Sequence, residues 1–183
     1  IYDIFAAKLA DAVKNLKVGP GDSEGVAIGP LINEQGLTKV KEHVRNALDN
    51  GGELVCGGKP HKAGPLFFEP TVIRNMNEKM LVNAEETFGP VAGLFRFSGE
   101  EEAVEKANDT RYGLASYFYS NDLGQVMRVS EALEFGMVAV NEPIVSGESV
   151  PFGGVKESGI GREGSKYGIE EFVDVKYILL GGL

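Results

Sequence analysis

The sequence predicts an α/β fold in which a largely parallel sheet is flanked by helices and followed by a C-terminal strand. Three observations support this class. Short β-forming runs alternate with helical patterns between residues 91 and 140, which is typical of βαβ units. Two amphipathic helical patterns precede them. A glycine-rich, loop-like stretch at 141–169 then separates this region from a final apolar run at 171–180.

The first half of the chain is predicted to begin with two helices. Apolar residues recur at helical spacing over 2–17 and over 34–50. Gly51 and Gly52 follow the second pattern as stop signals. The apolar face of the second helix carries Leu37, Val40, Val44, Ala47 and Leu48.

Two strands are predicted next, at 53–56 and 67–74. Pro70 lies inside the second run, and proline donates no backbone hydrogen bond to a ladder. We therefore expect the second strand at a sheet edge.

The second half supplies the alternating elements. Ser98 and Gly99 precede a cluster of glutamates, as in a capping box, and the glutamates suit the positive end of the helix dipole. The predicted order is a strand at 91–97, a helix opened by 98–101, a strand at 114–119, a helix at 122–135 and a strand at 136–140. The run at 171–180 ends the chain, and such a strand often adds to the sheet of a partner subunit.

Composition excludes several classes of function. The 183 residues contain 18 Lys+Arg and 27 Asp+Glu, a net charge of −9, so a nucleic-acid groove is not expected. No apolar run is long enough to span a membrane. The single cysteine forms no internal disulfide and indicates a reducing compartment, so we expect a cytoplasmic protein. The chain starts at Ile1 without an initiator methionine, which suggests a piece of a longer protein.

Two kinds of catalytic or metal site lack support in the sequence. Cys56 is the only thiol, but it is better interpreted as a small apolar residue that ends a strand. His43 neighbours the apolar face of a helix and His61 lies in a loop. No further ligand joins them at metal-binding spacing, so we predict no metal site.

The sequence 159–164 matches the G-x-G-x-x-G pattern of dinucleotide-binding folds. That pattern requires a strand before it and a helix after it, and residues 152–158 do not form a strand pattern. We therefore interpret the match as accidental.

Adjacent carboxylates at Glu85 and Glu86 precede the strand at 91–97. Neighbours in an extended chain point to opposite sides, so the two do not form an acid/base pair. A carboxylate in this loop could accept hydrogen bonds from sugar hydroxyls, and Phe88 could pack against a flat ring.

Four segments, in order along the chain, resemble motifs of the aldehyde dehydrogenase superfamily. They are Phe68-Glu69-Pro70-Thr71, Glu85-Glu86-Thr87-Phe88-Gly89-Pro90-Val91, Asn108 to Leu114, and Pro151 to Gly164. The closing stretches 164–169 and 176–183 look most like succinate-semialdehyde dehydrogenases.

The resemblance implies roles for four residues. Glu86 would bind the ribose hydroxyls of the nicotinamide in NAD or NADP, and Phe88 would pack near the nicotinamide. Phe152 would line the aldehyde pocket. Ser146 would help hold the far carboxylate of the substrate, where arginines outside this chain would supply the charge.

The resemblance also implies what the chain lacks. The family's nucleophilic cysteine, which forms a covalent thioester, and its general-base glutamate would lie upstream of Ile1, as would most of the NAD(P)-binding domain. Residues 1–157 would be the C-terminal part of the catalytic domain, and 158–183 a return loop and an oligomerisation strand that supports a homodimer or homotetramer. This chain alone is expected to be inactive.

Three functions stay open at this level. The first is oxidation of succinate semialdehyde to succinate by the complete enzyme. The second is oxidation of another aldehyde, such as glutarate semialdehyde or an aromatic aldehyde. The third is a non-catalytic α/β oligomerisation module.

Overall fold

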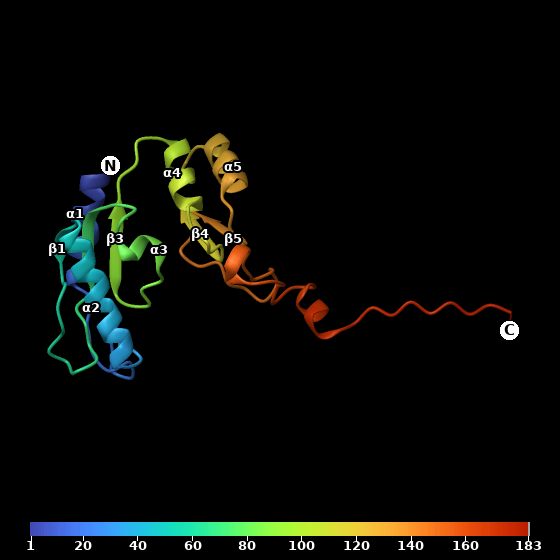
Figure 1. Cartoon of the computed structure of the whole chain (residues 1–183), viewed down its shortest axis with the longest axis horizontal. Helices are drawn as coiled ribbons and strands as arrows, with labels where there is room; N and C mark the ends of the chain where they lie inside the picture. The colour runs from blue at the N-terminus through green and yellow to red at the C-terminus, as the bar shows by residue number, and fades with distance from the viewer. Residues whose placement is uncertain (183) are drawn as a thin grey trace. The chain divides into compact units, whose positions relative to one another are not determined.

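The computed structural model describes residues 1–182, and the chain separates into two compact units (Figure 1). The first unit comprises residues 1–97, and the second begins at Ser98. The predicted boundary between 157 and 158 differs from this division and stays a prediction about the complete protein.

The first unit is a three-stranded sheet with helices packed on it. Helices α1 and α2 both contact strands β1 and β2. The sheet order is β1-β2-β3, with β1 antiparallel and β3 parallel to β2. The elements are α1 (Tyr2–Lys14), α2 (Glu34–Asp49), β1 (Glu53–Cys56), β2 (Thr71–Met76), α3 (Leu81–Ala84) and β3 (Val91–Phe95).

The prediction that the strand after Pro70 lies at a sheet edge is wrong. That strand, β2, is the middle strand of the sheet. Pro70 lies one residue before β2 begins, so its missing N–H costs no ladder bond. Thr71, the first residue of β2, donates its backbone N–H to the carbonyl of Pro90 at 2.8 Å.

The core of the first unit forms between α2 and the sheet. The predicted apolar face of α2 is buried at Leu37, Val40, Val44 and Ala47, whereas Leu48 is 37% exposed, so that residue was wrongly assigned to the face. The sheet and its connections contribute Phe68, Ile73, Met76 and Met80 to the same cluster. Asn33 caps α2 by accepting a hydrogen bond from the N–H of Gly36 at 2.9 Å.

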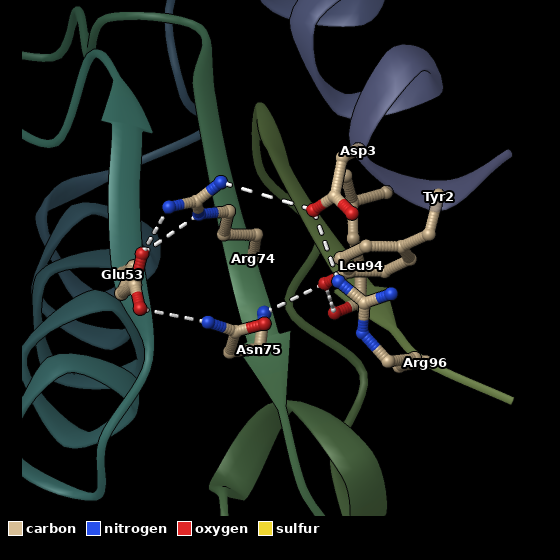
Figure 2. A network of polar contacts seen from close by, with 7 residues as sticks. All are labelled: Tyr2, Asp3, Glu53, Arg74, Asn75, Leu94 and Arg96. Carbon is tan, nitrogen blue, oxygen red and sulfur yellow. Dashed lines mark hydrogen bonds and ion pairs between the residues drawn. The ribbon is translucent and has the colours of Figure 1, made fainter.

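Tyr2 connects α1 to strands β2 and β3 of the sheet (Figure 2). Its hydroxyl donates to the carbonyl of Leu94 at 2.9 Å and accepts from the N–H of Asn75 at 2.7 Å. The guanidinium of Arg96 lies over the Tyr2 ring at 4.1 Å and pairs with Asp3 at 2.9 Å. These contacts fix the first turn of α1 against β2 and β3.

Glu53 extends the same network across β1 and β2. Its carboxylate pairs with the Arg74 guanidinium at 2.6 Å and accepts a hydrogen bond from the Asn75 side chain at 2.8 Å (Figure 2). The hydrogen bond and the charge of Arg74 lower the pKa of Glu53. A lowered folded-state pKa means that this stabilisation is present above the unfolded-state pKa and is lost as pH falls through the folded-state value.

We therefore expect Glu53→Gln to reduce the acid sensitivity of the fold. Its urea midpoint should fall below that of the wild type at pH 7, and this deficit should be smaller at pH 3, because a lower pH protonates more of the native carboxylate. Urea titrations of both proteins at the two pH values measure this. Glu78→Gln, which alters an exposed loop carboxylate of the same unit, is the control. An equal deficit at both pH values would contradict the prediction.

The second unit contains the last strand-helix-strand part of the predicted series, whereas its first strand, β3, pairs with β2 in the sheet of the first unit, so the series does not form one sheet. Strands β4 (Ala115–Phe118) and β5 (Met137–Val140) pair in parallel and are joined by α5 (Leu123–Ala132). Helix α4 (Glu100–Asn108) precedes them, and short 3₁₀ helices follow at Lys156–Ser158 and Gly168–Phe172. The α/β prediction with sheets flanked by helices is thus confirmed, and the ladders β2–β3 and β4–β5 are parallel.

The two N-terminal caps of these helices differ. Asp122 caps α5 by accepting from the N–H of Gln125 at 2.9 Å. Before α4 the predicted capping box is only half formed. The Glu102 carboxylate accepts from the N–H of Ser98 at 2.8 Å, but Gly99 is the cap residue and has no side chain to return the bond.

The predicted C-terminal strand is not seen as a strand among residues 1–182. Residues 168–172 form a 3₁₀ helix, and residues 173–182 are exposed and make no backbone hydrogen bond to the rest of the described chain. A strand exists only when a neighbouring strand accepts and donates its backbone bonds. The strand at 171–180 therefore stays a prediction that concerns a partner sheet.

Within residues 1–182, none of the helices is long and apolar enough to cross a membrane. The same residues contain no group of three or more His, Cys, Asp or Glu side chains arranged to hold a metal ion.

Candidate functional site

The loop 85–90 carries the two residues expected to bind the cofactor. It joins α3, which ends at Ala84, to β3, which begins at Val91. The Glu86 side chain is exposed, and Phe88 is 82% exposed. An exposed carboxylate and an exposed ring two residues apart can accept hydrogen bonds from sugar hydroxyls and pack against a planar heterocycle. The described residues thus fit a nicotinamide nucleotide at this loop.

Phe88 has an unusual backbone conformation. Its φ is 47°, in the left-handed region that bulky residues avoid. Such a conformation costs on the order of 1–3 kcal/mol and persists only where the surroundings enforce it, commonly at functional sites. The combination of a strained backbone and an exposed aromatic ring supports a binding role for this residue.

His43 of α2 lies beneath this loop. It is 1% exposed, its Nδ1 lies 3.0 Å from the Thr87 hydroxyl, and its Nε2 lies 3.4 Å from the Glu85 carboxylate. The sequence places His43 beside the apolar face of its helix and gives no support for it as a metal ligand, but it does not reveal this contact. A signal was available, because His43 follows Val40 by three residues and precedes Ala47 by four, which places it on the buried face.

The two residues expected to bind the substrate lie in the second unit. Ser146 and Phe152 line one hollow of about 510 Å³, together with Glu148 and Glu163. Phe152 is held by two backbone hydrogen bonds with Glu163, at 2.9 and 2.7 Å. The structure therefore brings this predicted pair together. The cofactor pair Glu86 and Phe88 belongs to the other unit.

The G-x-G-x-x-G match at 159–164 does not form a dinucleotide-binding turn. A 3₁₀ helix at Lys156–Ser158 precedes it in place of a strand, and Glu163 pairs back onto Phe152. The Arg162 guanidinium donates to the carbonyls of Gly154 and Gly161 at 2.8 and 2.6 Å. The glycines thus permit a tight return loop, as the interpretation of an accidental match predicts.

Cys56 ends β1 and is half-buried. It lines a hollow of about 250 Å³ with His61, Lys14 and Glu69. The backbone N–H of Ala63 donates to Nδ1 of His61 at 3.2 Å, so this imidazole is already engaged in its own loop. The position agrees with the interpretation of Cys56 as a strand-end residue.

Comparison with known proteins gives consistent matches along the chain. Residues 1–178 match the aldehyde dehydrogenase family. The chain is 55% identical to 3-sulfolactaldehyde dehydrogenase of Pseudomonas putida over 183 residues, and 52% identical to succinate-semialdehyde dehydrogenase [NADP(+)] of Escherichia coli over 181 residues. These alignments cover 100% and 99% of the chain but 38% of each relative.

Solved structures agree with the sequence matches. A succinate-semialdehyde dehydrogenase from Burkholderia pseudomallei superposes with a TM-score of 0.94 and 56% identity, over 97% of this chain and 37% of that one. A betaine aldehyde dehydrogenase from Staphylococcus aureus in complex with NAD+ superposes with a TM-score of 0.87 and 40% identity, over 93% of this chain and 35% of that one. The chain belongs to the aldehyde dehydrogenase family.

Proposed function

We propose that the complete protein oxidises a short aldehyde with an anionic group at its far end, with succinate semialdehyde as the substrate and NAD or NADP as the cofactor. The observation that carries this proposal is the match along the whole chain to relatives named for succinate semialdehyde, at 50–54% identity. Bound NAD or NADP would accept the hydride.

The substrate class is supported by what the names of the relatives share. Succinate semialdehyde, glutarate semialdehyde and 3-sulfolactaldehyde each combine an aldehyde with a carboxylate or sulfonate, and relatives named for each are 51–55% identical to this chain. The second candidate is therefore another member of this class, glutarate semialdehyde or 3-sulfolactaldehyde.

Ser146 and Phe152 would form the chain's contribution to the substrate pocket. The Ser146 hydroxyl can donate to a carboxylate oxygen, and the Phe152 ring can exclude water beside the carbon chain. Glu148 and Glu163 line the same hollow and would repel an anion. The positive charge that an anionic substrate requires must therefore come from residues beyond those lining this hollow, in agreement with the arginines that the resemblance places upstream.

Glu86 and Phe88 would form the chain's contribution to the cofactor site. The carboxylate would accept hydrogen bonds from the ribose hydroxyls, and the ring would limit the tilt of the nicotinamide. Together these contacts would fix the position and the tilt of the nicotinamide relative to the aldehyde, and the rate of hydride transfer depends steeply on both. The nucleophile and the general base are proposed to lie outside residues 1–183. The cytoplasm is the proposed location, and the exposed segment 173–182 is proposed to pair with a partner subunit in a homodimer or homotetramer.

The test is a substrate profile of the complete gene product with each cofactor. We expect kcat/KM for succinate semialdehyde to exceed that for butanal, which lacks the anionic end, at least tenfold, because a charged hydrogen bond contributes about 1.5–3 kcal/mol. Ser146→Ala should raise KM for succinate semialdehyde about tenfold and leave butanal unchanged. Equal kcat/KM values for the two aldehydes would overturn the substrate class, and no turnover of any aldehyde would overturn the proposed activity.

A further inference from the structure

The geometry beneath the loop 85–90 points to His43 as a positioning residue: its buried imidazole holds the loop in the conformation that presents Glu86 and Phe88. This inference rests on the proposed function, in which those two residues bind the cofactor. His43 itself is 1% exposed and does not reach a ligand from its place in the core.

Both ring nitrogens of His43 face the same loop. Nδ1 lies 3.0 Å from the Thr87 hydroxyl and Nε2 lies 3.4 Å from the Glu85 carboxylate. In the tautomer with the proton on Nε2, this proton faces the carboxylate and Nδ1 accepts from the hydroxyl, so both nitrogens have a partner. Leaving a buried polar group without its partner destabilises the folded state. The imidazole and the loop therefore hold each other in place.

The partners of His43 alternate along the loop. Glu85 has extended backbone angles, φ −119° and ψ 137°, and successive side chains of an extended chain point to opposite sides. With Glu85 and Thr87 turned toward α2, Glu86 between them is turned away from it. The contacts of Glu85 and Thr87 with His43 therefore also determine that Glu86 is exposed.

A second contact fixes the other side of Phe88. Gly89 lies so close to α2 that a Cβ atom at this position would overlap the side chain of Val40. Phe88 is therefore held between Thr87, bonded to His43, and Gly89, packed on Val40. Its own ring is 82% exposed and contributes little packing, so these flanking contacts enforce the left-handed backbone at Phe88.

The experiment compares four variants of the complete gene product. His43→Leu places an apolar side chain in the core and removes both polar contacts. His43→Asn instead keeps a polar group near the position of Nδ1. Thr87→Val removes only the hydroxyl from the partly exposed loop, which keeps the test valid if the core variants fail to fold. Val44→Ala is the matched control, because Val44 is the next residue of α2 and is 4% exposed in the core.

We expect His43→Leu to raise the Kd for NAD(P)H, measured by its fluorescence, about tenfold, with KM for the aldehyde changed less than twofold. Thr87→Val should shift the Kd in the same direction by a smaller factor, and His43→Asn should recover part of the loss. Val44→Ala should lower Tm and leave the Kd unchanged. A wild-type Kd in both His43→Leu and Thr87→Val, or an equal rise in Val44→Ala, would overturn the inference.

Amide hydrogen exchange separates this inference from the proposed function. In His43→Leu, or in Thr87→Val if the former does not fold, we expect faster exchange at residues 86–89 and unchanged exchange in β1. If the wild-type protein binds neither cofactor, the proposed function fails, and the exchange data still decide whether His43 holds the loop. Unchanged exchange at 86–89 would overturn the inference.

Discussion

Glu86→Gln in the complete gene product is expected to slow the single-turnover formation of NAD(P)H by about 10- to 100-fold. The amide keeps the size of the side chain but replaces a charged acceptor, which contributes about 1.5–3 kcal/mol per hydrogen bond, by a weaker neutral one. The side chain is exposed in a loop, so its replacement should leave the fold intact.

Rapid-mixing measurements with saturating aldehyde and cofactor test this expectation, because they separate the chemical step from product release. Glu78→Gln, in another loop of the same unit, serves as the control for loss of a single charge. A single-turnover rate equal to that of the wild type would contradict the assignment of Glu86 to the cofactor site.

Phe68→Ala is expected to lower the free energy of unfolding by about 3–5 kcal/mol, which for many domains is a large part of the total. Phe68 is 1% exposed and belongs to the cluster formed by α2 and the sheet. Its removal leaves a cavity lined by residues that cannot fully collapse, so the loss exceeds the transfer free energy of the ring.

Urea unfolding followed by far-UV circular dichroism measures the change, and the slope should stay constant if the denatured state is unaltered. Phe68→Leu should give a smaller loss, about 1–2 kcal/mol, and provides a value if the alanine variant does not fold. Leu54→Ala on β1, where the side chain is 45% exposed, is the control and should cost less than about 1 kcal/mol. A loss below about 1 kcal/mol for Phe68→Ala would contradict the described core.

Elements with local signals were predictable from the sequence. Helix α2 combines a 3.6-residue apolar period, a capping Asn33 and a following glycine pair, and its observed bounds differ from the prediction by one residue. The βαβ unit from β4 to β5 was predictable for the same reason. The order of strands in a sheet is set by contacts between distant residues, and this is why β2 lies in the middle despite Pro70.

The candidate site was predictable in part. The motif resemblance predicts roles for Glu86, Phe88, Ser146 and Phe152, and the structure adds that the last two line one hollow. The spacing along α2 indicates that His43 is buried, but its contact with Thr87 was not predictable, because the two residues are 44 positions apart and share no local motif. Such a contact emerges only when α2 and the loop pack on the same core.

The exposed end of the chain has a consequence for handling the protein. Residues 173–182 present Val175, Tyr177 and Ile178 to solvent along with unbonded backbone groups. An extended apolar segment with free N–H and C=O groups is a template for intermolecular β-aggregation. Asp174 and Lys176 interrupt the apolar run and act as charged gatekeepers that oppose such stacking. Neutralising both charges should therefore shorten the time before a concentrated solution turns turbid.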